Sequence, residues 1–197
     1  MRIRSLLAPV GLGASALLLA ALAGAPSAVG GGTSVTAAGT SFTPATLKVG
    51  QGTTVTWSFT GRHTTTSNQG FWDSGSQSNG SFPEAMPSSG KFPYHCEFHV
   101  SLGMKGTIVV PLKATGSAGA GYTLRWSASA AGAGRAFDVQ FRRQGTAAWH
   151  AFKTNATTAS AHFNPSRAGT YQLRARTSNT AAGKESGWSP VISRRIS

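Results

Sequence analysis

One cysteine, two histidines and one methionine are spaced so that they could bind a metal ion. Cys96 is the only cysteine of the 197-residue chain, and His99 and Met104 follow it after three and eight residues. His63 comes earlier, after the strand-like run 53–59. A thiolate, two imidazoles and a weak thioether are the donors of a trigonal copper site with a long axial bond, the kind used for electron transfer. The sequence therefore predicts one type 1 copper ion held by His63, Cys96, His99 and Met104.

The N-terminus has the three-part pattern of a secretory signal peptide. Arg2 and Arg4 precede an apolar run over residues 6–22 that ends in small residues. We expect residues 1–28 to be a signal peptide, cut between residues 23 and 28, and the mature chain to be periplasmic, in the cell envelope or extracellular. A retained signal anchor is the alternative. No later segment has the roughly 20 apolar residues that span a bilayer.

A single cysteine is unusual in an exported protein, where cysteines normally pair as disulfides. An intermolecular disulfide, a reactive thiol or a bound metal would each account for it. The neighbours His99 and Met104 favour the metal. The alternative is that Cys96 is only a buried thiol and His99 only a surface residue.

Charge is distributed unevenly along the chain, which predicts two domains. Residues 30–111 have four basic and three acidic side chains, whereas residues 112–197 have twelve basic and two acidic ones. The residues between them are small and aperiodic, as in a linker. We predict a copper-binding domain over 30–111, a linker over 112–120 and a second domain over 121–197.

The first domain is predicted to be an antiparallel β-sandwich, because short β-branched and aromatic runs alternate with turn residues. Helical periodicity is absent. Phe92, Tyr94 and Cys96 alternate along the last strand before the cysteine loop, so all three side chains should face the core. Pro93 within that run favours an edge strand or an irregular start.

The segment from Thr33 to Pro111 resembles a small cupredoxin of the plastocyanin and amicyanin group. The matching motifs are Ser41-Phe42-Thr43-Pro44, Leu47-Lys48-Val49-Gly50, Val55-Thr56-Trp57, His63-Thr64, Phe71-Trp72-Asp73-Ser74-Gly75, Gly90-Lys91-Phe92-Pro93-Tyr94-His95-Cys96 and Gly103-Met104-Lys105-Gly106. The resemblance implies a cupredoxin Greek-key β-sandwich, and it places the family's copper ligands on the same four residues that the spacing suggests.

One residue departs from the family pattern. Many members have an asparagine directly after the first ligand histidine, whose side chain steadies the cysteine loop, and this chain has Thr64. A hydroxyl still makes hydrogen bonds, so the departure bears on the tuning of the copper more than on its binding. The resemblance also makes His99 the ligand nearest solvent. Val100 and Leu102 beside it would form a docking patch for a protein redox partner, or merely cover the site.

Other candidate ligands fit less well. His95 is adjacent to Cys96 in a strand, so its side chain should point to the opposite face. Met86 is an alternative axial ligand that lacks the loop spacing. Glu97 and Lys105 are expected to be rim charges.

The composition argues against several enzyme classes. Five histidines are too few for a multicopper oxidase or a nitrite reductase, and only five carboxylates are present. A Ser/His/Asp arrangement therefore has little support, and we do not expect an enzyme.

The second part resembles a fibronectin type III domain. Alternating, half-buried strand patterns cover Tyr122–Trp126, Phe137–Phe141, Ala161–Phe163 and Tyr171–Arg176. The run Gly169-Thr170-Tyr171 matches the tyrosine corner, and Trp188-Ser189-Pro190 stands before the last strand as in that family. The resemblance implies a second, smaller immunoglobulin-like β-sandwich. Trp126, Trp149 and Trp188 are expected in its core.

Arg142, Arg174 and Arg176 should point outward from these strands and gather on one sheet face. Such a platform could bind an anionic cell-surface polymer or an acidic protein. The alternative is that these charges simply keep the surface soluble. We expect no nucleic-acid partner, and no metal role for His150 or His162.

These patterns together predict an exported carrier of single electrons that cycles between Cu(I) and Cu(II). The alternative is a copper-sequestering or adhesion protein anchored by its basic C-terminal module. A cupredoxin that has lost its copper is disfavoured, because all four ligand types are present.

Overall fold

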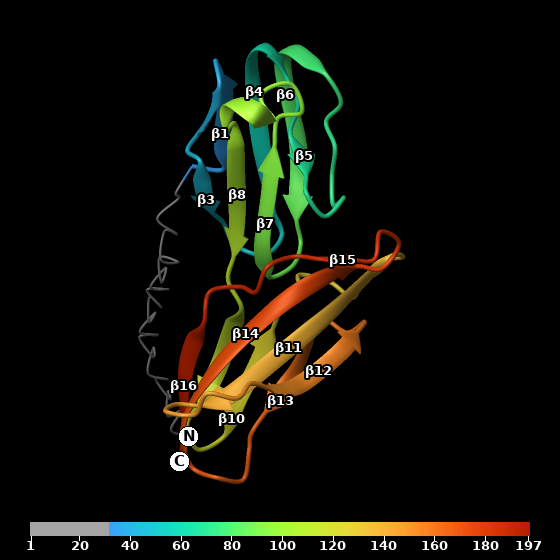
Figure 1. The fold of residues 1–197 in the computed structure, drawn as a ribbon. Coiled ribbons are helices and arrows are strands. Elements are labelled where there is room, and N and C mark those ends of the chain that lie inside the picture. Colours follow the sequence, from blue (N-terminus) through green and yellow to red (C-terminus); the bar gives the residue numbers. More distant parts are fainter. Residues whose placement is uncertain (1–31) are drawn as a thin grey trace, which may run out of the picture. The chain divides into compact units, whose positions relative to one another are not determined.

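The computed structural model describes residues 32–197, and almost all of its regular structure is β (Figure 1). The one helical element of the described residues is the 3₁₀ turn η1 (Val100–Leu102). No helix among the described residues is long and apolar enough to cross a membrane. The predicted signal peptide and its cut lie outside the described residues. The predicted all-β class with two β-sandwiches is confirmed.

Two four-stranded sheets form the first sandwich, in the orders β2-β1-β4-β6 and β3-β8-β7-β5. Its strands are β1 (Ser34–Ala38), β2 (Ser41–Thr43), β3 (Thr46–Lys48), β4 (Thr53–His63), β5 (Thr66–Ser67), β6 (Gln77–Met86), β7 (Gly90–His95) and β8 (Lys105–Val110). The prediction of a purely antiparallel sandwich is wrong, because β1 pairs with β4 and β3 pairs with β8 in parallel. The chain makes other strands between the members of each pair, so a crossover can bring them side by side.

The core of the first sandwich follows the predicted alternation. Phe92, Tyr94 and Cys96 are 4%, 1% and 0% exposed. Tyr94 packs edge-on against Trp57, with ring centroids 5.4 Å apart. Its cross-strand neighbour is Gly106, where a Cβ would lie 2.3 Å from the tyrosine ring. Only glycine leaves room for that ring, which places the strand leading to Cys96 against β8.

Pro93 lies in an inner strand rather than at an edge, which corrects the prediction. Strand β7 stands between β8 and β5. Beyond the end of the short β5, the N–H of Asn68 donates to the Pro93 carbonyl at 3.0 Å. The proline is tolerated because its missing N–H falls past the end of β5, where no strand carbonyl needs it.

The second sandwich consists of a sheet β13-β10-β9 and a sheet β12-β11-β14, in which β14 also pairs with β15 and β16. Its strands are β9 (Lys113–Ser117), β10 (Gly121–Arg125), β11 (Arg135–Arg143), β12 (His150–Ala156), β13 (Ser160–Phe163), β14 (Gly169–Asn179), β15 (Lys184–Glu185) and β16 (Ile192–Ile196). The segment 112–120 is not a linker throughout, because β9 pairs with β10. Four of the five β9 residues are exposed. The strand therefore forms through backbone pairing, and its sequence shows no alternation of apolar residues that would have predicted it.

The core of the second sandwich also matches the expected alternation. Val139, Leu173 and Ala175 are fully buried, and Trp126 is 1% exposed. The hydroxyl of Tyr171 donates to the carbonyl of residue 167 at 2.7 Å, which is the contact of a tyrosine corner. Trp126 is therefore a core residue as predicted, and the tyrosine-corner motif is real.

The two sandwiches have separate hydrophobic cores but belong to one compact unit, Gly31–Ser197. Hydrogen bonds join them directly. Lys91 and Gly187 exchange two backbone hydrogen bonds of 2.8 Å each. The buried Thr177 hydroxyl lies 2.8 Å from Ser88 Oγ. Polar contacts of this kind fix the second sandwich against the base of β7.

Candidate metal centre

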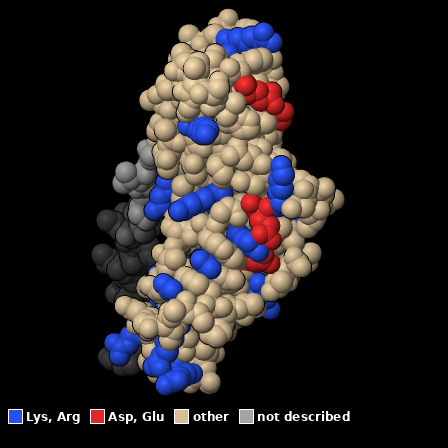
Figure 2. Space-filling view, viewed as in Figure 1, with Lys and Arg blue, Asp and Glu red and all other residues tan. Residues whose placement is uncertain are grey.

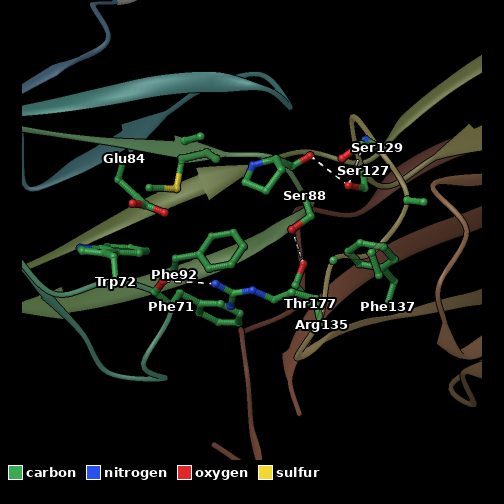
Figure 3. Close-up of a pocket in the computed structure, with 16 residues that line it drawn as sticks. Phe71, Trp72, Glu84, Ser88, Phe92, Ser127, Ser129, Arg135, Phe137 and Thr177 are labelled. Atoms are coloured by element: carbon green, nitrogen blue, oxygen red, sulfur yellow. Dashed lines mark hydrogen bonds between the residues drawn. The ribbon is translucent and has the colours of Figure 1, made fainter. Parts of the chain in front are cut away.

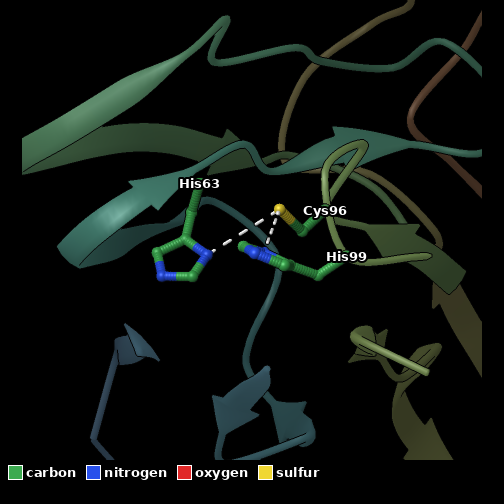
Figure 4. Close-up of side chains that lie close together, drawn as sticks. All are labelled: His63, Cys96 and His99. Atoms are coloured by element: carbon green, nitrogen blue, oxygen red, sulfur yellow. Dashed lines mark hydrogen bonds between the residues drawn. The ribbon is translucent and has the colours of Figure 1, made fainter. Parts of the chain in front are cut away.

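Three side chains bring their donor atoms together at one end of the first sandwich (Figure 4). Cys96 Sγ lies 3.8 Å from His63 Nδ1 and 3.5 Å from His99 Nδ1. All three donor atoms lie within 4.8 Å of one another. An ion bound at about 2.0 Å by nitrogen and about 2.3 Å by sulfur in a trigonal plane would hold the two donors about 3.7 Å apart. The observed separations therefore fit one metal ion between these atoms.

The loop that carries two of the donors is closed by its own backbone. The N–H of His99 donates to the Cys96 carbonyl at 3.2 Å, and the N–H of Met104 donates to the His99 carbonyl at 3.1 Å. The N–H of Cys96 in turn donates to the Met104 carbonyl at 3.1 Å. Gly103 ends the 3₁₀ turn in the left-handed region, with φ of 85°. This ring of bonds holds Cys96, His99 and Met104 at fixed spacing.

His63 is oriented by a hydrogen bond on the far side of its ring. Its Nε2 lies 3.1 Å from the Thr60 carbonyl, and the side chain is only 2% exposed. A carbonyl can only accept, so Nε2 carries the hydrogen and the lone pair stands on Nδ1. That lone pair is on the nitrogen facing Cys96, as a metal ligand requires.

Thr64 does the work that the resemblance assigns to an asparagine. Its hydroxyl oxygen accepts the N–H of Glu97 at 3.0 Å, and its own N–H lies 3.4 Å from Cys96 Sγ. The first bond ties the cysteine loop to the end of β4. The second directs a backbone N–H toward the sulfur. Thr64 thus ties the cysteine loop to the end of β4, a contact that the sequence left open.

The Thr64 hydroxyl continues into a short chain of polar groups. Its oxygen lies 3.0 Å from Thr66 Oγ1, which lies 3.2 Å from a carboxylate oxygen of Asp73. The Asp73 carboxylate only accepts, so the single hydroxyl hydrogen of Thr66 serves it, and that of Thr64 serves Thr66. The Thr64 hydroxyl oxygen then keeps its lone pairs, one of which accepts the Glu97 N–H. The sequence analysis missed this chain although its members lie close together in the sequence, because the residue types alone do not show which hydroxyl meets which carboxylate.

The second sandwich holds the loop that leads to Asp73. Four consecutive carbonyls, those of residues 68–71, accept hydrogen bonds from its side chains. The donors are Lys184 Nζ to Asn68 at 3.4 Å, Asn179 Nδ2 to Gln69 at 3.1 Å and to Gly70 at 2.8 Å, and Arg135 Nη2 to Phe71 at 3.2 Å. Contacts of this kind have no signature in the sequence, because donors and acceptors are more than 60 residues apart.

The remaining candidate residues take different places. His95 lies outside the cluster, with Nδ1 2.7 Å from Asn68 Oδ1. Met86 pairs with Thr53, at the opposite end of β4 from His63, and ten residues of strand span about 33 Å. The alternative of Met86 as axial ligand is therefore wrong. Met104 is fully buried in the first core, and its role as the axial ligand stays a prediction.

Apolar side chains surround the exposed edge of the site. Phe98, Val100 and Leu102 are 40%, 40% and 65% exposed. The guanidinium of Arg62 stacks on the Phe98 ring at 4.2 Å. His99 is half-buried among them, whereas Cys96 and His63 are closed off from solvent. The surface next to His99 is thus both apolar and accessible.

The basic face of the second sandwich is built differently. Arg142, Arg174 and Arg176 alternate with Trp149 and Trp188 in one stack. The distances from guanidinium to ring centroid are 4.6 and 4.0 Å for Arg142 and Arg174 over Trp149, and 4.4 and 4.7 Å for Arg174 and Arg176 over Trp188. The two tryptophans are half-buried partners of arginines, so the prediction that they lie in the core is wrong.

The edges of these guanidinium groups are also occupied. Arg142 donates to Gln172 at 2.7 Å, Arg174 to Gln140 at 2.7 and 3.0 Å, and Arg176 to Asp138 at 2.9 Å and to Glu185. Burial, followed by the charges of Arg142 and Arg176, lowers the pKa of Arg174. Figure 2 shows how few acidic side chains accompany the basic ones on one face of the molecule. Each of the three stacked arginines thus has partners within the chain for two of its guanidinium nitrogens.

Comparison with known proteins gives likenesses to two kinds of structure. No protein-family model and no curated protein matches the chain. The chain is similar to the purple cupredoxin of Nitrosopumilus maritimus, at 21% identity over 39% of this chain and 97% of that one, with a TM-score of 0.34. It is similar to the oxidized plastocyanin of Dryopteris crassirhizoma at 20% identity, over 39% and 98%, with a TM-score of 0.35. The FN1–FN3 domains of chicken CNTN1 match at 8% identity, over 77% and 62%, with a TM-score of 0.35. Scores this low support no functional argument, so function is argued from the site itself.

Proposed function

We propose that this protein carries single electrons through one type 1 copper ion bound by His63, Cys96, His99 and Met104. One observation supports this above all. The buried sulfur of Cys96 and two imidazole Nδ1 atoms converge at separations of 3.5 and 3.8 Å, which suit one ion. Soft sulfur donors favour Cu(I), and imidazole serves both oxidation states of copper.

The protein's contribution would be to keep the donors still. When bound, copper supplies the one-electron redox couple. The backbone ring from Cys96 to Met104, the Thr60 carbonyl behind His63 and the Thr64 bond to Glu97 all restrain ligand positions. Restrained ligands rearrange little when the charge of the metal changes, which favours rapid transfer. The site is thus suited to a carrier rather than to an enzyme.

A protein redox partner would dock around His99. The apolar rim of Phe98, Val100 and Leu102 surrounds the half-buried ligand. Electron-transfer contacts are small and brief, and a patch of this size fits them. We propose an exported location for this exchange, as the N-terminal sequence pattern predicts.

Reversible redox cycling tests the proposal. The purified mature protein, loaded with one equivalent of Cu(II), is reduced with ascorbate and reoxidised with ferricyanide while its visible spectrum is followed. We expect complete and rapid bleaching and recovery over many cycles. Tight copper binding with slow or incomplete exchange would instead support the alternative, a copper-sequestering or surface-adhesion protein.

A further inference from the structure

We propose that the cavity between the two sandwiches binds a small monocyclic aromatic carboxylate that also carries a hydrogen-bond donor. The cavity measures about 220 Å³ and lies away from the metal centre, among residues of both sandwiches (Figure 3). Its apolar lining includes Phe71, Trp72, Met86, Phe92 and Phe137. The inference does not depend on the proposed copper function.

The size and walls of the cavity suit one substituted aromatic ring. An apolar cavity of about 150 Å³ holds benzene, so about 220 Å³ leaves room for substituents. The Phe71 and Phe92 rings meet edge to face at 5.1 Å, and Trp72 lies 6.5 Å from Phe92. Aromatic walls favour a flat aromatic guest through stacked and edge-on contacts.

Arg135 provides the recognition of a carboxylate. Its guanidinium stacks on Phe71 at 4.3 Å, and Nη2 donates to the Phe71 carbonyl at 3.2 Å. Its Nη1 is buried and has no hydrogen-bond partner among the described residues. A buried donor without a partner is costly, and a ligand carboxylate would satisfy it with a charge-assisted bond.

Glu84 provides the recognition of a second polar group on the ligand. It lines the same cavity, and no ion pair joins it to Arg135 within residues 32–197. Burial raises the pKa of Glu84, and the charge of Arg135 opposes this only in part. A desolvated carboxylate gains from a donor, so a hydroxyl on the ligand suits it.

The hydroxyl groups in the lining compete little for the ligand. The Thr177 hydroxyl and Ser88 Oγ lie 2.8 Å apart and bond to each other, and Ser127 Oγ donates to the carbonyl of residue 87 at 3.3 Å. The charged groups left for a ligand are therefore those of Arg135 and Glu84, which line the same cavity without an ion pair between them in the described residues. 4-Hydroxybenzoate has both complementary groups on one ring and is the probe we choose.

Calorimetric titration of the full mature chain with 4-hydroxybenzoate tests this inference. We expect saturable binding of one molecule. Benzoate, which lacks the donor for Glu84, should bind several-fold more weakly. 4-Hydroxybenzyl alcohol, which lacks the carboxylate, should bind at least about tenfold more weakly, because the charged hydrogen bond is lost.

Two variants locate the binding. Arg135→Gln should weaken binding at least about tenfold, whereas Arg195→Gln, at an exposed arginine on β16, should not change it. Ser129→Trp places a large side chain at an exposed position of the cavity lining and should abolish binding without affecting the fold, because position 129 is exposed. This variant keeps the test decisive even if Arg135→Gln unfolds. Absence of binding by the wild type, or binding that survives Ser129→Trp, would overturn the inference.

Discussion

The two sandwiches use their polar side chains in opposite ways. At the candidate metal centre, His63, Cys96 and His99 bring three donor atoms within 4.8 Å of one another. On the face of the second sandwich, Arg174 is stacked between two tryptophans and bonded at its edge to Gln140. The first group brings its donor atoms together without partners among themselves that use them all, whereas each arginine of the second is already stacked and hydrogen-bonded within the chain. Convergent donor atoms therefore point to a ligand more strongly than a cluster of charges that stack on tryptophans.

Removal of the thiolate should have the largest effect of any single change in this comparison. Cys96→Ala removes the sulfur around which both imidazoles are arranged, so we expect complete loss of the blue charge-transfer band after addition of Cu(II). The matched control is His95→Ala, next in sequence but outside the cluster, which should leave the band largely intact. Visible absorption of the two variants checks this. Loss of the band from both would mean that the ligands are misassigned.

Thr64 tests whether the surroundings of the donors matter as well as the donors. Thr64→Val keeps the shape but removes the acceptor of the Glu97 N–H, and we expect a loss of about 1–3 kcal/mol in unfolding free energy, because a donor beside the site loses its partner. The reduction potential should shift too, since the cysteine loop is less restrained. Thr64→Ser should restore both properties. Denaturant unfolding and voltammetry measure them, and equal behaviour of the valine and serine variants would contradict the role of the hydroxyl.

Arg174 tests the other half of the comparison. Arg174→Ala removes two stacking contacts and the bonds to Gln140, so we expect a loss of about 1–2 kcal/mol in stability. The copper spectrum should not change. Arg174→Lys should recover little, because an ammonium lacks the flat, forked shape of a guanidinium. Thermal unfolding measures the effect, with Arg195→Ala, at an exposed arginine, as the control. If Arg174→Ala instead strongly weakened binding to an anionic polymer without loss of stability, the result would favour a binding platform.

Glu84 should give the smallest effect, and one that depends on pH. Its pKa is raised by burial, so the folded state favours the protonated form and loses stability as the pH rises above about 4. Glu84→Gln should therefore be more stable than the wild type at pH 7, by less than about 1 kcal/mol because the group is partly exposed. The difference should vanish near pH 3. A variant less stable than the wild type at pH 7 would show that attraction to Arg135 outweighs desolvation.

The sequence predicted that Cys96 and His99 lie together, because the information for that pairing is local. Cys96, His99 and Met104 lie within nine residues, and the alternation of Phe92, Tyr94 and Cys96 fixed which way the cysteine points. Only His63 is distant from this loop in the sequence. It was assigned to the site because a second imidazole completes the donor set, not because the sequence shows that the two segments pack together.

The parts that sequence reasoning missed depend on long-range pairing. Strand β9 looked like a linker because backbone bonds to β10, not apolar side chains, make it a strand. Trp149 and Trp188 looked like core residues because the local sequence does not distinguish a tryptophan that stacks on arginines from one that is buried in the core. The hydrogen bonds from Asn179 to the carbonyls of Gln69 and Gly70 join residues about 110 positions apart, and no pattern in the sequence indicates them.

The measurement that tests the central claim most directly is the visible and electron paramagnetic resonance spectrum of the mature protein with one equivalent of Cu(II). Coordination by Cys96, His63 and His99 in one plane predicts an intense blue thiolate band and a narrow copper hyperfine splitting. A pale protein with an ordinary tetragonal copper signal would contradict it, because it would mean that the three converging side chains do not bind copper as one site.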